Sequence, residues 1–146
     1  MANEVPYAFP VELLKGNHDF ASDTFNLALY TANPYTQSTS TVYVVTSESS
    51  GTEYSAGGNT LSGNAVSNVT DIATVDFTDS VWGSPTPATF SAAYGTIYNS
   101  SASNKLVVVL DFGGTKSCSN GTFTVTFPDP TSGSPSGADA LLSITS

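Results

Sequence analysis

"TFSAAYGTIYN", residues 89–99, and "KLVVVLDF", residues 105–112, are separated by a short Ser-rich break and carry the strongest strand pattern of the chain. The first stretch is rich in aromatic and β-branched residues, which favour a pleated and partly buried surface. The second is apolar at nearly every position, so we expect a central strand that is covered on both faces. These two segments predict that the fold is built on β-sheet.

A third segment, "TFNLALYT" at residues 24–31, alternates with a period of two. Phe25, Leu27 and Leu29 fall on one face and the residues between them on the other, which predicts a half-buried strand. Five further segments have strand composition and are bounded by turn residues. They are residues 42–45, 61–66, 72–77, 122–127 and 140–145.

The breaks between these segments are rich in Gly, Pro, Asn and Ser. In "YSAGGNTLSG", residues 54–63, two consecutive glycines stand between two strand-like stretches. A phosphate-binding loop needs a helix N-terminus and a Lys that supplies counter-charge, and this stretch has neither. We therefore predict that Gly57 and Gly58 form a tight turn with positive φ.

Helix signals are confined to "FPVELLKG", residues 9–16, where Pro10 suits a first turn and Gly16 a stop. The sequence thus predicts an all-β fold, an antiparallel β-sandwich or barrel of about eight strands with one short N-terminal helix. We expect an extended N-terminal arm at residues 1–10 and a single β-sandwich domain at residues 11–146. Residues 128–140, rich in Pro, Gly and Ser, are expected to form an exposed loop.

The charge balance restricts the partners. Three Lys, no Arg and twelve acidic residues give a net charge of −9, which argues against a nucleic-acid surface. Only 10% of the residues are charged, so the chain either buries much of its surface against neighbours or exposes Thr-rich strands. The N-terminal stretch lacks the features of a signal peptide and no segment is long enough to span a membrane, so we expect synthesis in the cytoplasm and no membrane partner.

Residues that could support catalysis are few. His18 is the sole histidine, and it follows the predicted helix stop, so we interpret it as a turn or capping residue. A nucleophile motif of the form G-x-S-x-G is absent from the sequence. Cys118 is the only cysteine and is expected to be a small, partly buried thiol. We predict no enzymatic activity, no catalytic residue and no cofactor.

Acidic residues at two places could offer oxygen ligands to a calcium ion. They are Asp71, Asp76 and Asp79 in one segment, and Asp19 and Asp23 in another. The twelve-residue loop pattern of common calcium sites is absent, and a period of two places Asp76 and Asp79 on opposite strand faces. We therefore predict no metal site.

The order of the segments resembles a family of small structural proteins encoded by tailed bacteriophages. A short helix leads into a first strand of the form D-T-x-x-x-A-L, and a Y-x-A-G-G-x-x-L turn follows. A Y-x-x-I-Y strand pairs with an L-x-x-x-x-D-F-G strand, and N-G-x-F-x-V precedes a terminal strand. In this chain these motifs are residues 23–29, 54–61, 94–98, 106–113 and 120–125.

The resemblance implies a non-enzymatic virion protein, a capsid decoration or cement protein that binds the outside of the phage head and stabilises it. Its implied partners are the major capsid protein and further copies of itself, as a homo-oligomer on the virion surface. The alternative is a tail, neck or fibre component that contacts host glycans. Tyr94, Tyr98 and Trp82 could stack on sugar rings in that case, although their alternation favours a place in the core.

The predicted arm supplies candidate contact residues. Val5, Tyr7 and Phe9 alternate with polar or small residues, and prolines bias their neighbours toward extended backbone. Such an arm either packs on its own sandwich or adds along a sheet edge of a neighbouring subunit. In the second case, Tyr7 and Phe9 would be the anchors.

Overall fold

The structure, a computed structural model, describes residues 3–69, 71–128 and 141–145. Its main element is an antiparallel hairpin of β6 (Ala88–Asn99) and β7 (Lys105–Gly121). The hairpin runs from Asn99 opposite Lys105 to Ala88 opposite Gly121, with shifts in register along the way. The two segments with the strongest strand pattern in the sequence therefore pair with each other.

Two more strands, β1 (Phe25–Tyr30) and β2 (Asn59–Thr60), complete a four-stranded sheet in the order β2-β1-β6-β7. The prediction that residues 105–112 form a central strand is wrong, because β7 lies at the edge of this sheet. Its first half is nevertheless buried. Short β-bridges to Glu4 and Val42 cover its backbone. A continuous apolar pattern therefore indicates that both faces of a strand are covered, but not whether the strand lies at the centre or the edge of its sheet.

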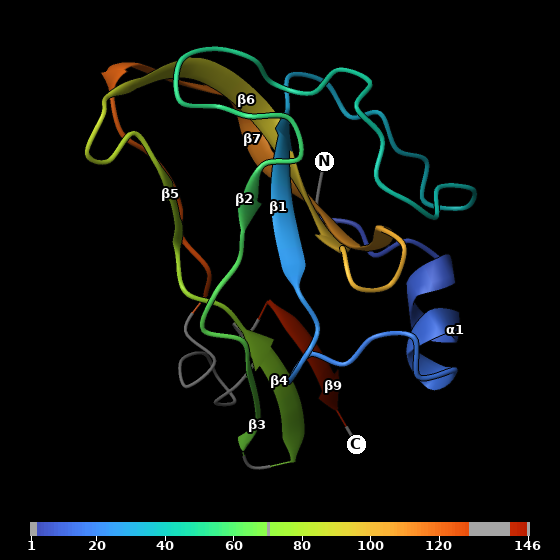
Figure 1. Cartoon of the computed structure of the whole chain (residues 1–146). Helices are drawn as coiled ribbons and strands as arrows, with labels where there is room; N and C mark the ends of the chain where they lie inside the picture. The colour runs from blue at the N-terminus through green and yellow to red at the C-terminus, as the bar shows by residue number, and fades with distance from the viewer. Residues whose placement is uncertain (1–2, 70, 129–140, 146) are drawn as a thin grey trace.

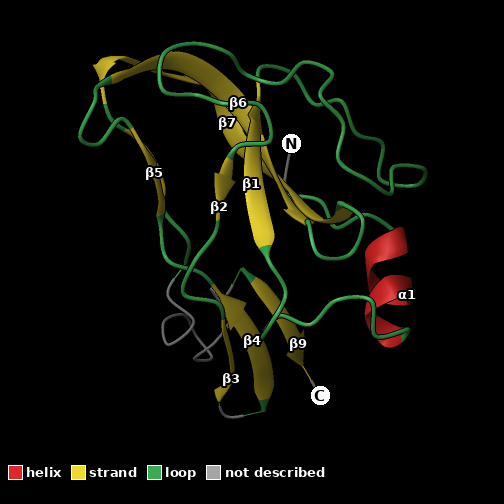
Figure 2. Ribbon diagram, viewed as in Figure 1, coloured by secondary structure: helices red, strands yellow, loops and turns green. Residues whose placement is uncertain are grey.

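Two smaller sheets accompany the main one (Figures 1 and 2). One has three strands: β3 (Ala65–Val69), β4 (Ile72–Asp76) and β9 (Leu142–Thr145). The other pairs β5 (Ser80–Trp82) with β8 (Phe123–Val125). All strand pairs are antiparallel, which confirms the predicted all-β class, and the arrangement is sandwich-like.

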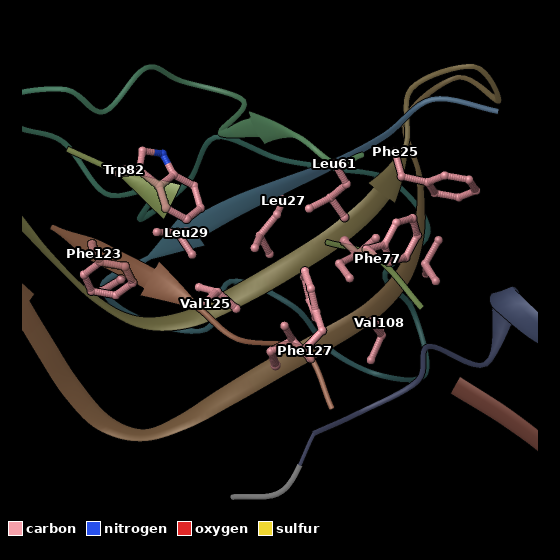
Figure 3. Close-up of a cluster of buried hydrophobic side chains, with 14 of the residues drawn as sticks. Phe25, Leu27, Leu29, Leu61, Phe77, Trp82, Val108, Phe123, Val125 and Phe127 are labelled. Carbon is pink, nitrogen blue, oxygen red and sulfur yellow. The ribbon is translucent and has the colours of Figure 1, made fainter. Parts of the chain in front are cut away.

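The main core lies against one face of the four-stranded sheet. From β1 it takes Phe25, Leu27 and Leu29, as the period of two predicts. Trp82 of β5 and Phe123 of β8 close this core from the other side (Figure 3). The core is strongly aromatic, because Phe20, Phe25 and Phe77 stack and tilt against one another at ring-centre distances of 4.7 to 6.5 Å.

A second cluster buries the opposite face, so β1 is buried on both faces and not on one as expected. The segment between β1 and β2 covers this face, and no strand forms at residues 42–45. The Val44 N–H donates to the Tyr35 hydroxyl at 3.2 Å, and the Val44 carbonyl accepts from the Tyr30 hydroxyl at 2.8 Å. Tyrosine hydroxyls therefore satisfy backbone groups that a neighbouring strand would otherwise pair.

The N-terminal region also differs from the expectation. Helix α1 spans Ala8–Leu14, so residues 8–10 of the predicted extended arm are helical. Pro10 lies in the first turn, where its missing N–H breaks no helical hydrogen bond. The helical turn also places Phe9 in the core. The predicted loop at residues 128–140 lies outside the described residues except for Pro128, which is exposed.

Candidate functional site

The three predicted contact residues have different environments. Phe9 is only 6% exposed and its ring centre lies 5.1 Å from that of His18, so it belongs to the chain's own core. Val5 is partly buried and packs against the same core. Tyr7 is 61% exposed, which makes it the one member of the trio with a largely free side chain. A role for these residues in partner contact stays a prediction.

His18 is not a simple turn residue, because it is buried at the centre of a polar network. Its Nε2 lies 3.4 Å from Glu12 Oε2, and its Nδ1 lies 3.2 Å from Asn99 Nδ2. The second oxygen of Glu12 accepts from Lys105 Nζ at 2.6 Å. The network joins α1 to the β6–β7 hairpin. Asn99 and Lys105 lie 81 and 93 residues from their partners His18 and Glu12, so no sequence motif reveals the network.

The network fixes the protonation of His18. Asn99 Oδ1 accepts from the Ala102 N–H and Asn99 Nδ2 donates to Asp23 Oδ2, so the amide presents an N–H to His18 Nδ1. Nδ1 must then accept, and Nε2 carries the proton toward Glu12. Burial lowers the pKa of His18 below its usual 6.5, and the hydrogen bond to Glu12 offsets only part of this effect. The imidazole is neutral and enclosed, which suits a structural anchor.

Three of the five acidic residues weighed as calcium ligands accept hydrogen bonds from the chain itself. Asp19 accepts from the Ala21 N–H and the Ser22 hydroxyl, which lowers the pKa of its carboxyl. Asp23 accepts from the Asp19 N–H, and Asp79 accepts from the backbone N–H of residue 127 at 2.9 Å. Within residues 3–69, 71–128 and 141–145, no group of three or more His, Cys, Asp or Glu side chains could hold a metal ion.

The glycine pair forms the predicted turn, with φ of 93° at Gly57 and 71° at Gly58. The Gly57 N–H donates to Glu48 Oε1 at 2.7 Å, and the Tyr54 hydroxyl donates to the same oxygen at 2.8 Å. The donor that a phosphate would need is therefore already bonded to a carboxylate of the chain itself. The Tyr98 hydroxyl donates to the Gly57 carbonyl at 2.9 Å, which holds the turn against β6.

The aromatic residues considered for sugar stacking lie mainly inside the protein. Trp82 and Tyr98 are 3% and 5% exposed, which confirms the core interpretation for both. Tyr94 is half-buried and packs against the second cluster. Neither Trp82 nor Tyr98 can offer a ring face to a ligand in solution.

A groove of about 340 Å³, which we call the apolar groove, lies between α1 and the three-stranded sheet. Val66 and Ile144 of that sheet are 57% and 63% exposed, although both are large and apolar. The residues of its walls are almost all apolar. They are Val5, Phe9, Pro10, Leu13, Phe20, Val66, Ala73, Thr74, Val75, Leu142 and Ile144.

A second groove, of about 480 Å³, lies where the N-terminal segment meets the loop after β1. We call it the polar groove, because amides, hydroxyls and a carboxylate line it beside the exposed Tyr7. Its lining residues are Glu4, Tyr7, Asn33, Tyr35, Thr36, Gln37 and Ser38. The sequence offered no motif for this groove, since its two walls are about 30 residues apart in the chain.

Comparison of the chain with protein-family models, curated proteins and solved structures found no match. Among the described residues, no helix has the length and apolar character that crossing a bilayer requires. Function is therefore inferred from the chain's own residues and surfaces.

Proposed function

We propose that the chain is a non-enzymatic structural protein of a bacteriophage virion. In this proposal it is a decoration protein that binds the outside of the head, with the major capsid protein and further copies of itself as partners. The sequence motifs described above support this proposal, because all five follow one another in the expected order between residues 23 and 125. The all-β body and the low content of charged residues suit a protein whose role is to cover a surface.

The observation that carries the proposal is the apolar groove. Val66 and Ile144 are both more than half exposed, beside the apolar residues of α1. Burial of apolar surface stabilises a contact by about 25 cal/mol per Å², so a partner that covers this groove gains affinity without any ion pair. The occupant that we propose is the outer face of the assembled shell.

Binding of this kind stabilises a shell by mass action. A protein that binds the assembled shell but not its separated subunits shifts the equilibrium toward assembly. At a free concentration about 100 times its Kd, each bound copy contributes about 2.7 kcal/mol. Many symmetric copies therefore add up to a large resistance to disassembly.

The first experiment measures copy number in purified virions of the phage that encodes the chain. A decoration protein should be present at on the order of hundreds of copies per particle, because it repeats with the symmetry of the shell. A handful of copies would contradict a place on the head and favour the tail, neck or fibre. Absence from the particles would contradict a virion role altogether.

A second experiment tests whether the apolar groove binds the shell. We expect the Val66→Asp, Ile144→Asp double variant to lose at least about tenfold in affinity for particles that lack their native copies, since charge is then buried in an apolar contact. Val45→Asp is the matched control, because Val45 is 65% exposed and lies outside the groove. Equal occupancy by the double variant and the control would show that the shell does not bind this groove.

A further inference from the structure

The polar groove is a preformed surface. The Tyr7 N–H donates to the Gln37 carbonyl at 3.0 Å, which joins the N-terminal segment to the loop that forms the other wall. On the N-terminal side, Glu4 and Val109 exchange both of their backbone hydrogen bonds at 2.8 Å. Both walls are thus held by the main chain, so a ligand would meet a surface that needs little ordering.

Two amides in this groove have fixed and opposite polarity. Gln37 uses its Nε2 to donate to the Val5 carbonyl at 3.1 Å, and within the described residues its Oε1 keeps the capacity to accept. Asn33 uses its Oδ1 to accept from the Tyr35 N–H at 2.9 Å, and its Nδ2 keeps the capacity to donate. With the Glu4 carboxylate, the groove offers one defined donor and two acceptors.

These groups define the chemistry of a ligand. A sugar hydroxyl donates one hydrogen bond and accepts others, so neighbouring hydroxyls can satisfy the Asn33 donor and the Gln37 and Glu4 acceptors together. The C–H face of a pyranose ring can lie on the exposed ring of Tyr7, which has an apolar face and a polar end. No Lys lines the groove, and a chain of net charge −9 disfavours an anionic ligand.

We propose that the polar groove binds a neutral saccharide, with one pyranose ring on Tyr7 and its hydroxyls bonded to Asn33, Gln37 and Glu4. The polar groove is shallow and open, so a bound sugar would keep part of its surface in water. The inference is independent of the proposed virion role, because the polar groove and the apolar groove share no lining residue. An experiment can therefore refute particle binding without refuting sugar binding, and the reverse.

The test begins with an array of neutral and sialylated glycans. Free methyl glycosides of glucose, galactose, mannose and N-acetylglucosamine are then titrated into the full chain and followed by two-dimensional NMR. We expect at least one neutral sugar to bind with a Kd of about 1 mM and to shift the amide signals of Tyr7 and Gln37. Absence of shifts at ten times that concentration, or a preference for sialylated glycans, would overturn the proposal.

Three variants separate binding from folding. Tyr7→Ala should weaken binding about tenfold, whereas Tyr7→Phe should stay close to wild type because it keeps the ring. Asn33→Asp keeps the acceptor for the Tyr35 N–H but turns the donor into an acceptor, so it should also weaken binding. Leu14→Ala is the control, since Leu14 is 89% exposed on α1 and outside the groove.

All variants should retain the thermal midpoint of the wild type to within a few degrees, because Tyr7 and Leu14 are exposed and Asn33→Asp keeps the bond to the Tyr35 N–H. Binding that survives Tyr7→Ala and Asn33→Asp would place the sugar elsewhere and refute the assignment. A loss of binding in Leu14→Ala equal to that in Tyr7→Ala would refute it as well.

Discussion

Gly58→Ala should be among the most destabilising single-methyl changes in this protein. Gly58 has a φ of 71°, and a Cβ there would overlap the carbonyl oxygen of Leu27 and lie 2.6 Å from its carbonyl carbon. The left-handed backbone costs an L-residue about 1–2 kcal/mol. Displacement of the β1 backbone, which cannot move aside as a side-chain end does, adds about 1–3 kcal/mol. We expect the free energy of unfolding to fall by about 3 kcal/mol.

Gly16→Ala is the matched control. Gly16 has nearly the same φ, 74°, but no atom lies within 4 Å of the position its Cβ would take. The change should therefore cost only the backbone contribution, about 1 kcal/mol. Urea unfolding followed by circular dichroism measures both variants, and the thermal midpoint of Gly58→Ala should fall by roughly 10 °C. If the two variants lose equal stability, the close approach of the turn to β1 is not what requires glycine at position 58.

Two further predictions concern the buried network. The folded state disfavours protonated His18, so it binds fewer protons there than the unfolded chain, and stability should fall as pH drops below about 6.5. Urea unfolding from about pH 7.5 to about pH 5 should show a smaller loss in His18→Gln than in the wild type, and parallel curves would disprove the effect. Lys105→Met should cost about 2 kcal/mol at neutral pH, because it leaves the mostly buried Glu12 carboxylate without its cation. A double-mutant cycle with Glu12→Gln should show that the double change costs less than the sum of the single ones, and strict additivity would show that the pair contributes nothing.

Patterns within a few neighbouring residues were sufficient to predict several features of the fold. The period of two in β1 placed Phe25, Leu27 and Leu29 on the main core, because side chains of a strand point alternately to its two faces. Gly57 and Gly58 were correctly predicted as a turn, since positive φ is a property of single residues. The all-β class followed from the number and spacing of such segments.

The same patterns failed where contacts beyond the immediate sequence neighbours decide the local structure. Residues 42–45 have strand composition, yet tyrosine hydroxyls from elsewhere satisfy the backbone of Val44. Phe9 was expected in an extended arm, but burial against His18 and Phe20 favours the helix that begins at Ala8. In both cases contacts between residues 9 to 14 positions apart outweigh the preference of the immediate neighbours.

Composition, strand alternation and turn chemistry were determined by the sequence alone, because each depends on a few neighbouring residues. The tertiary structure alone decided that Glu12, His18, Asn99 and Lys105 meet in one network, since up to 93 residues separate its bonded members. It also decided the two grooves, whose walls come from separate segments of the chain. Surfaces of this kind exist only after the chain has closed on itself, and a single sequence does not state which of its segments will become neighbours.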